Sequence, residues 1–492
     1  MKIKNFSEVK SFFLDNKDLK QTILKNTFWL FFAQAFARLV SLIIVIWSAR
    51  YFGPEIYGKF SFSFSFVALF IVFTDFGMSN LIMREVAKDK SKTSQYIDNM
   101  FFLKIILAVI ILPVIVILIH FIRNDPETLK LVYFLGVYVI INSFSSFFES
   151  IFMGNEKMQY AATCVFLGDL FLLFFVCLFI LNGLPILTIS YAYIISAVAE
   201  TFLAIILVWH YFAKFFLKIS FKICKEIFMD VWPFGLMAVF VSTYYYFNSV
   251  ILGISRSNQE VGWYNAAFKT AFFTISISGI IFMSFFPSIS RSFKKNAEKF
   301  RSAYNRYATV TFIIGTPLGF GGFLVAPELI KFLYQEPYHN AILPFQILVW
   351  GVSLNFLCNT YCNCLLACDE QKKALKAVTM GVAFSVLMNL ILIPIYGIIG
   401  AAIVLPFTEL LVLIVAHNEL KKIIKTSFFK LLTYPLIASL MMSIFLIIFK
   451  KVGISSPILL IIFGAAVYFS AFYFLFRANK LKFLKFIYYE EK

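Results

Sequence analysis

The stretch FWLFFAQAFARLVSLIIVIWSARYFGPEIYGKFSFSFSFVALFIVFTDF (28–76) sets the pattern for the whole chain. It holds two long apolar runs, joined by a short turn that contains Gly53, Pro54 and Gly58. A helix needs about 20 apolar residues to cross the hydrocarbon core of a bilayer, and each run is long enough. The stretch therefore predicts a hairpin of two membrane-spanning helices, over 28–49 and 60–80.

The composition of the whole chain agrees with this interpretation. The 492 residues are 61% hydrophobic and 14% charged, whereas soluble domains are roughly 45–50% apolar and about 25% charged. This excludes a soluble enzyme, a disordered protein and a secreted disulfide scaffold. Similar apolar runs recur to the end of the chain, and they predict an all-α polytopic membrane protein with about 14 transmembrane helices. One run of about 40 residues is too long for a single crossing, so we expect a tight turn at Gly397 within it. The polar N-terminus contains no recognisable cleavable signal peptide.

The net charge of +18 predicts the orientation. Most of the 44 Lys and Arg fall in alternate segments between the predicted spans, beginning with the N-terminus. Basic residues collect on the cytoplasmic side of membrane proteins. We therefore expect both termini to be cytoplasmic, and we interpret the basic termini as orientation signals rather than as a nucleic-acid interface.

The first hairpin has a counterpart later in the chain. RYFGPEIYGKF (50–60) corresponds to LGISRSNQEVGWYNAAFK (252–269), and each has an acid, then a Gly, then an aromatic residue. Chance recurrence of short loops and membrane glycines is the alternative, but a duplicated half is an arrangement found in transporters. The predicted parts are an N-terminal cytoplasmic segment (1–27), a six-helix N-lobe (28–212), a cytoplasmic linker (213–231), a six-helix C-lobe (232–417), an extra helix pair (418–476) and a cytoplasmic tail (477–492).

Two cations lie deep within predicted spans, Arg38 in the first and Lys269 in the eighth. A charged group at the bilayer centre is costly, so it faces a cavity or a partner. Gln34 shares a helix face with Arg38, and Tyr245 and Asn248 lie together in the seventh span. These five residues predict a cationic cavity for an anionic substrate such as a pyrophosphate. Internal ion pairs are the alternative, for example Arg38 with Asp75, and Lys104 is expected to extend to the inner interface.

Four acids within the spans, Asp75, Glu149, Glu200 and Glu409, are candidates for coupling transport to H⁺ or Na⁺. Pairs that only stabilise the helix bundle are the alternative. Asp169 is expected at the inner interface. No other cofactor is predicted.

Four cysteines in the tenth span, at 358, 362, 364 and 368, resemble a metal motif. On a helix they form two pairs that point in different directions, so they cannot surround one zinc ion. We predict apolar packing for them, with no metal site and no catalytic residues. The absence of a Walker sequence argues against ATP hydrolysis, and we expect no enzymatic activity.

At RYFGPEIYGKFSFSFS (50–65), DFGMSNLIMREVAKDK (75–90), FMGNEKMQYA (152–161) and VGWYNAAFK (261–269), the chain resembles Wzx-type polysaccharide exporters. These belong to the superfamily of oligosaccharidyl-lipid and multidrug exporters that also contains MATE transporters and lipid II flippases. One departure is Asn248, because relatives often carry Asp in the seventh span before its closing Leu-Gly. The resemblance therefore does not extend to cation binding by that helix.

The resemblance implies a two-lobed, MATE-like fold that works by alternating access. It implies a flippase in the bacterial inner membrane that moves undecaprenyl-pyrophosphate-linked oligosaccharide to the periplasmic leaflet for O-antigen, capsule or exopolysaccharide. Membrane lipid and the polymerase and chain-length proteins of that pathway would be its partners. A multidrug or small-cation exporter of the same fold, and a membrane glycan polymerase or ligase, are the alternatives.

Overall fold

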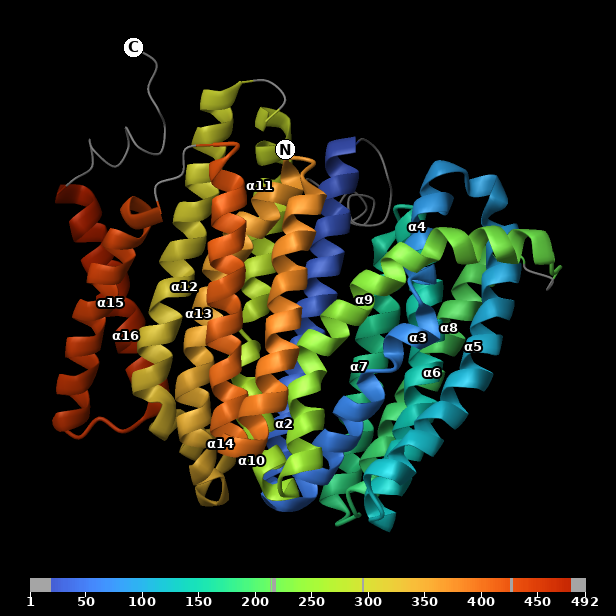
Figure 1. Cartoon of the computed structure of the whole chain (residues 1–492), viewed down its shortest axis with the longest axis horizontal. Helices are drawn as coiled ribbons and strands as arrows, with labels where there is room; N and C mark the ends of the chain where they lie inside the picture. Colours follow the sequence, from blue (N-terminus) through green and yellow to red (C-terminus); the bar gives the residue numbers. More distant parts are fainter. Residues whose placement is uncertain (1–18, 213, 215–217, 294–295, 425–427, 479–492) are drawn as a thin grey trace, which may run out of the picture. The chain divides into compact units, whose positions relative to one another are not determined.

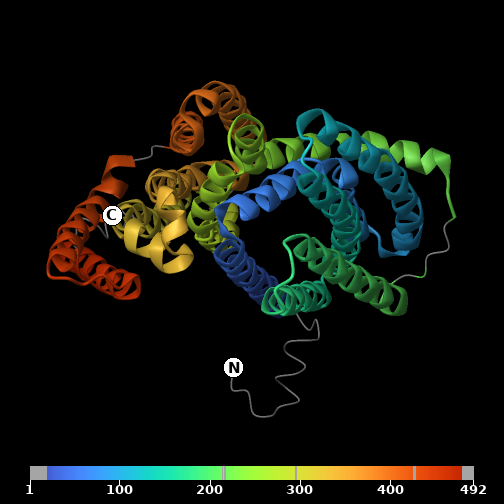
Figure 2. The same cartoon turned by 90° about the horizontal axis from the view of Figure 1, so that it is seen from below.

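The computed structural model describes residues 19–212, 214, 218–293, 296–424 and 428–478. Within these ranges every regular element is a helix (Figures 1 and 2). The α-helices are α2 (Leu19–Ala68), α3 (Ile71–Asp75), α4 (Met78–Lys88), α5 (Thr93–Ile122), α6 (Pro126–Gly154), α7 (Met158–Leu181), α8 (Leu187–Tyr211), α9 (Phe221–Ser255), α10 (Asn258–Phe272), α11 (Ile275–Phe293), α12 (Ala297–Tyr334), α13 (Ile342–Ala367), α14 (Gln371–Lys421), α15 (Phe428–Lys451) and α16 (Pro457–Ala478). Two short 3-10 helices are η1 (Lys90–Lys92) and η2 (Glu336–Ala341).

The prediction of an all-α polytopic membrane protein is confirmed. The described residues form 12 segments long and apolar enough to cross a membrane. The predicted number of 14 is not confirmed by this count. Two of the segments contain α2 and α14, which are 50 and 51 residues long, and a straight helix of that length would extend about 75 Å.

Both long helices are interrupted at a glycine. Gly53 in α2 and Gly397 in α14 have positive φ values of 72° and 56°, a conformation that glycine adopts without steric cost. The chain reverses at Gly397. A Cβ on Gly400 would clash with the backbone oxygen of Leu392, so the residues on the two sides of the turn lie against each other. The predicted tight turn at Gly397 is therefore confirmed.

The chain packs as two compact units. The first comprises residues up to Phe52 together with Lys59–Val250, and the second comprises Gly53–Gly58 and everything from Ile251 onward. These units are defined by packing and not by internal repetition, so the predicted six-helix lobes and their boundaries stay a prediction.

In the first unit, α6 packs against α3, α4, α5, α7 and α8. Its core joins residues of α4 and α6, such as Leu81 and Phe148, to Val231 of α9, and all three are at most 2% exposed. By contrast, Phe121 at the end of α5 and Leu181 at the end of α7 are more than 80% exposed. Large apolar side chains on the outside suit contact with lipid, which is as apolar as they are.

In the second unit, α13 packs against α10, α11, α12 and α14. The C-terminal pair α15 and α16 lies beside α12 in both views (Figures 1 and 2). Val325 of α12, Met442 of α15 and Leu460 of α16 form part of their shared core.

The turn of the first hairpin packs tightly on the start of α10. A Cβ added to Gly58 would clash with the backbone oxygen of Asn258. A Cβ added to Gly262 would clash with the backbone oxygen of Pro54. Each of these two glycines thus lies against the backbone of the other segment. Only a residue without a Cβ allows two backbones to approach so closely.

We therefore expect Gly58→Ala and Gly262→Ala each to lower the unfolding temperature of the purified protein in detergent by several degrees, because the backbones must separate. Gly279→Ala is the matched control, since no atom lies within 4 Å of the position of its side chain. Equal unfolding temperatures for all three variants would contradict the tight contact. The measurement is thermal unfolding followed by intrinsic fluorescence.

Candidate functional site

The residues of the predicted cationic cavity belong to both units. Arg38 and Gln34 on α2 are exposed within the first unit, which also holds Tyr245 and Asn248 of α9. Arg38 lies close enough to Tyr246 of α9 to interact with it electrostatically. Lys269 is half-buried on α10 in the second unit. A cavity shared by Arg38 and Lys269 therefore stays a prediction.

Asp75 has a different partner from the one considered in the sequence. Its carboxylate accepts a hydrogen bond of 2.7 Å from Nζ of Lys104 rather than pairing with Arg38. The side chain of Lys104 is fully buried and lies over the rings of Phe144 and Phe147. The expectation that Lys104 reaches the interface is therefore wrong, because the half-buried Asp75 attracts the ammonium group inward.

A break in the helix positions Asp75 for this contact. Phe76 and Gly77 have positive φ values of 48° and 86°, which separate α3 from α4. The carboxylate of Asp75 accepts hydrogen bonds from the backbone N–H and the hydroxyl of Ser79, at 3.2 and 2.7 Å. It thereby stabilises the start of α4 while it balances the charge of Lys104.

Three acids from neighbouring helices gather in the first unit. Glu149 of α6 and Glu200 of α8 hydrogen-bond to each other through their side chains, and Asp169 of α7 acts on both electrostatically. One carboxyl oxygen of Asp169 is fully buried without a hydrogen-bond partner. Asp169 therefore belongs to a partly buried group of three acids, and its expected position at the inner interface stays a prediction.

A hydrogen bond between Glu149 and Glu200 has a chemical requirement. Two ionised carboxylates only accept hydrogen bonds, so one of the pair has to carry a proton. Gly168 provides the space, because a Cβ at that residue would lie 2.8 Å from a carboxyl oxygen of Glu200. The three helices thus bring two carboxyl groups together, and a hydrogen bond between them forms only when one of the two is protonated.

Glu409 in the second unit is balanced by amides. It is 2% exposed and accepts a 2.7 Å hydrogen bond from Asn355, which accepts one of 2.8 Å from Asn359. This is a chain of side-chain hydrogen bonds between α13 and α14. A hydrogen bond from an amide N–H helps to compensate a buried carboxylate.

The cysteines of α13 fall into two pairs, as predicted. The sulfurs of Cys358 and Cys362 are 3.9 Å apart, and Cys364 pairs with Cys368. Across the described part of the chain, no group of three or more His, Cys, Asp or Glu side chains is arranged to hold a metal ion.

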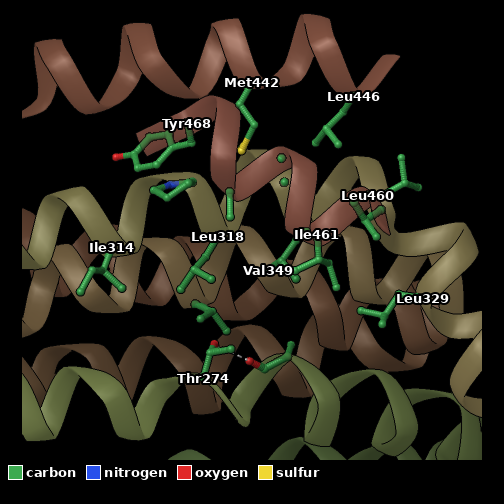
Figure 3. A pocket seen from close by; sticks show the side chains of 18 of the residues that line it. Thr274, Ile314, Leu318, Leu329, Val349, Met442, Leu446, Leu460, Ile461 and Tyr468 are labelled. Carbon is green, nitrogen blue, oxygen red and sulfur yellow. Dashed lines mark hydrogen bonds between the residues drawn. The ribbon is translucent and has the colours of Figure 1, made fainter. Parts of the chain in front are cut away.

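A pocket that the sequence did not indicate lies between α12, α13 and the C-terminal pair (Figure 3). Its volume is about 380 Å³, and aliphatic side chains such as Leu318, Val349 and Leu460 point into it. The hydroxyl of Tyr468 is engaged with the backbone oxygen of Ile313 at 2.7 Å. The lining is therefore almost entirely apolar.

The sequence of this chain matches a known protein family. A family model described as polysaccharide biosynthesis protein matches residues 23–293, which is more than half of the chain. The chain belongs to this family. The predicted relationship to Wzx-type exporters is confirmed, and two named relatives match this chain along most of its length.

The family includes proteins named as flippases. The chain is 21% identical to a protein named as a probable low-salt glycan biosynthesis flippase, Agl15, of Haloferax volcanii, over 91% of this chain and 94% of that protein. It is 22% identical to a putative O-antigen transporter of Shigella flexneri, over 78% of this chain and 94% of that protein. Both relatives are thus named for moving molecules across a membrane, one in glycan biosynthesis and one for O-antigen.

Solved structures share the fold. The lipid II flippase MurJ, in an inward closed conformation, superimposes with a TM-score of 0.79 at 15% identity, over 91% of this chain and 98% of that chain. An inward-facing MATE multidrug transporter of the MOP superfamily gives 0.64 at 19% identity, over 80% and 96%. The predicted MATE-like fold is confirmed.

The pair of Asp75 and Lys104 should be essential for stability. Removing one partner of a buried ion pair costs about 3–5 kcal/mol, because the other charge stays buried. We expect Lys104→Met to destabilise the protein strongly, and the double variant Asp75→Asn with Lys104→Met to recover much of the loss. Thermal unfolding in detergent would measure both effects.

Lys88→Met is the control for this pair. Lys88 forms an ion pair with Glu85 at 2.9 Å, but its side chain is 61% exposed, and surface pairs contribute about 0–1 kcal/mol. A double variant as unstable as the Lys104 variant would show that the pair is not the source of the loss.

Proposed function

We propose that the protein is a flippase that moves undecaprenyl-pyrophosphate-linked oligosaccharide units from the cytoplasmic to the periplasmic leaflet for O-antigen, capsule or exopolysaccharide assembly. The similarity to glycan flippases along nearly the whole chain is the observation that carries the proposal. The protein would lie in the bacterial inner membrane with both termini in the cytoplasm. It would act as a transporter and not as an enzyme, beside the polymerase and chain-length proteins of its pathway.

In this proposal, Arg38 and Lys269 hold the pyrophosphate. An Arg side chain matches phosphate oxygens with its two-pronged guanidinium, and Lys adds a point charge. Gln34, Tyr245 and Asn248 would donate hydrogen bonds to the sugars. The cavity would open alternately to each side as the two halves rock, as in other transporters with internal repeats.

The apolar pocket of the second unit would receive part of the lipid tail. Its lining by aliphatic side chains of α12, α13, α15 and α16 favours a hydrocarbon chain and disfavours sugars or phosphate. The tail could then stay in an apolar environment while the polar part crosses.

The coupling ion would be H⁺ rather than Na⁺, and Glu149 and Glu200 would carry it. Asp75 is balanced by Lys104 and Glu409 by Asn355, whereas the hydrogen bond between Glu149 and Glu200 already requires a proton. Gain and loss of that proton would make or break the contact between α6 and α8. Such a contact can couple proton movement to a conformational change.

Replacement of the two cations tests the substrate site. We expect Arg38→Ala and Lys269→Ala each to lower lipid-linked oligosaccharide flipping about tenfold or more, which corresponds to about 1.4 kcal/mol of lost interaction. Flipping is measured in proteoliposomes that contain the lipid-linked oligosaccharide, by its exposure to a membrane-impermeant glycosidase. Surface polysaccharide in cells provides a second readout.

Lys130→Ala is the matched control, because Lys130 is an exposed cation at the start of α6. Wild-type flipping by Arg38→Ala and Lys269→Ala at normal membrane levels would overturn the cationic site. Transport of drugs but not of glycan by the wild-type protein would instead favour the multidrug exporter.

A pH gradient tests the carboxyl pair. In the same proteoliposomes, we expect an imposed H⁺ gradient to accelerate flipping by the wild-type protein and by the control Glu226→Gln, an exposed acid on α9. Glu149→Gln and Glu200→Gln should keep gradient-free exchange but lose the acceleration, because an amide cannot release the proton. Acceleration that persists in both variants, or that follows a Na⁺ gradient instead, would contradict proton coupling through this pair.

A further inference from the structure

Another pocket of the second unit combines polar side chains with apolar ones such as Ile342 and Ile398. It forms where α10 begins, η2 leads into α13, and α14 turns at Gly397, and its volume is about 580 Å³. Glu260, Trp263, His339, Asn340 and Gln346 contribute the polar and aromatic groups of its lining. Pockets of this size with a few converging polar groups are typical of small-ligand sites.

Hydrogen bonds fix the walls of this pocket. The indole N–H of Trp263 donates to the backbone oxygen of Pro337 at 2.8 Å, and the amide of Gln346 donates to that of Phe323 at 3.1 Å. Trp263 is half-buried, so its ring is held in place while part of it stays accessible. A preorganised wall lowers the entropy lost on binding.

The turn of α14 is held in place by Arg256, which lies just before the start of α10. Arg256 donates to the backbone oxygens of Pro394 and Ile395 at 2.6 and 3.0 Å. This fixes Ile398, which lines the opposite wall. Ser257 caps α10 through the backbone N–H of Glu260 at 3.2 Å, and thereby positions that carboxylate.

A second, smaller pocket of about 230 Å³ continues the first, and Pro327, His339 and Ile342 line both. It contains Gln335, whose backbone has φ 67° and ψ −172°. This region is almost restricted to glycine, and strained residues of this kind cluster at ligand sites. We call the two pockets together the polar trough.

The mixed chemistry of the trough favours a sugar, which has hydroxyls and an apolar ring face, over an anion. In the larger pocket the charged group of the lining is the Glu260 carboxylate, which repels phosphate, and the nearby Arg256 guanidinium is already engaged with two backbone oxygens of α14. In the smaller pocket, the ammonium of Lys331 is paired with Glu336 at 3.1 Å and the carboxylate of Glu328 with Lys450 at 2.8 Å. Amide, imidazole and carboxylate groups suit hydroxyls, and the face of an indole suits the apolar face of a sugar ring.

We propose that the polar trough binds the sugar part of the substrate on the extracytoplasmic side. The loops at this end carry few Lys and Arg, which predicts the outer side of the membrane. The proposal rests on the proposed glycan flippase function and adds a second glycan contact to it, one that is reached after the central cavity. The trough would favour release outward by competing for the sugars as they leave.

The probe is oligosaccharide released by mild acid from the lipid-linked pool of the source organism. The full-length protein, labelled with 5-fluorotryptophan, is reconstituted in nanodiscs, and Trp263→Phe assigns its signal among the six Trp. We expect a saturable ¹⁹F shift at Trp263 and none at Trp350, which lies against Phe320 instead. Asn340→Ala and Glu260→Gln should weaken the apparent affinity at least fivefold, and inorganic pyrophosphate should cause no shift.

Absence of a saturable shift, or an equal response to oligosaccharide in Asn340→Ala, would overturn the proposal. A Trp263 signal that changes with lipid composition but not with oligosaccharide would do the same, because it would mark an aromatic side chain anchored in the membrane interface. The flipping assay separates the two levels of inference. Wild-type protein that flips glycan but shows no Trp263 response refutes only the trough, whereas absence of flipping refutes the proposed function.

Discussion

The need to satisfy every backbone polar group in the absence of water governs this chain. Within lipid, an unpaired backbone N–H or C=O costs several kcal/mol, so a spanning segment has to be helical unless protein groups replace the missing bonds. The interruptions of the long helices follow this requirement. At Phe76 and Gly77, the side chain of Asp75 accepts from the backbone of α4. At Gly397, Arg256 donates to the carbonyl oxygens that the turn leaves unpaired.

The described structure neutralises buried acids in three different ways. Asp75 has an opposite charge in Lys104, Glu409 has an amide donor in Asn355, and Glu149 and Glu200 meet each other. The third arrangement depends directly on a proton held between two acids, because two ionised carboxylates can only accept hydrogen bonds. The same type of residue, a carboxyl group within a span, can therefore serve structure at one position and coupling at another. The partner decides between them.

The sequence predicted local features better than partners. The helical class, the reversal at Gly397 and the two directions of the cysteines follow from apolar length, glycine conformation and helical periodicity. Periodicity shows which residues share a face, but not which helix that face meets. For this reason it suggested Arg38 for Asp75, where packing supplies Lys104. The apolar pocket and the polar trough were also missed, because their walls come from helices far apart in the sequence.

The placement of the first hairpin turn has a consequence for synthesis of the protein. Gly53–Gly58 belongs to the second unit, although the residues on both sides belong to the first. Its contact with Asn258 and Gly262 cannot form until some 200 further residues have been made, which takes about 10–40 s at ordinary translation rates. During that interval the backbone of the turn lacks the segment around Asn258 and Gly262 that it packs against in the complete protein. The nascent protein thus enters the membrane with its first hairpin incomplete, and the later half provides the missing surface.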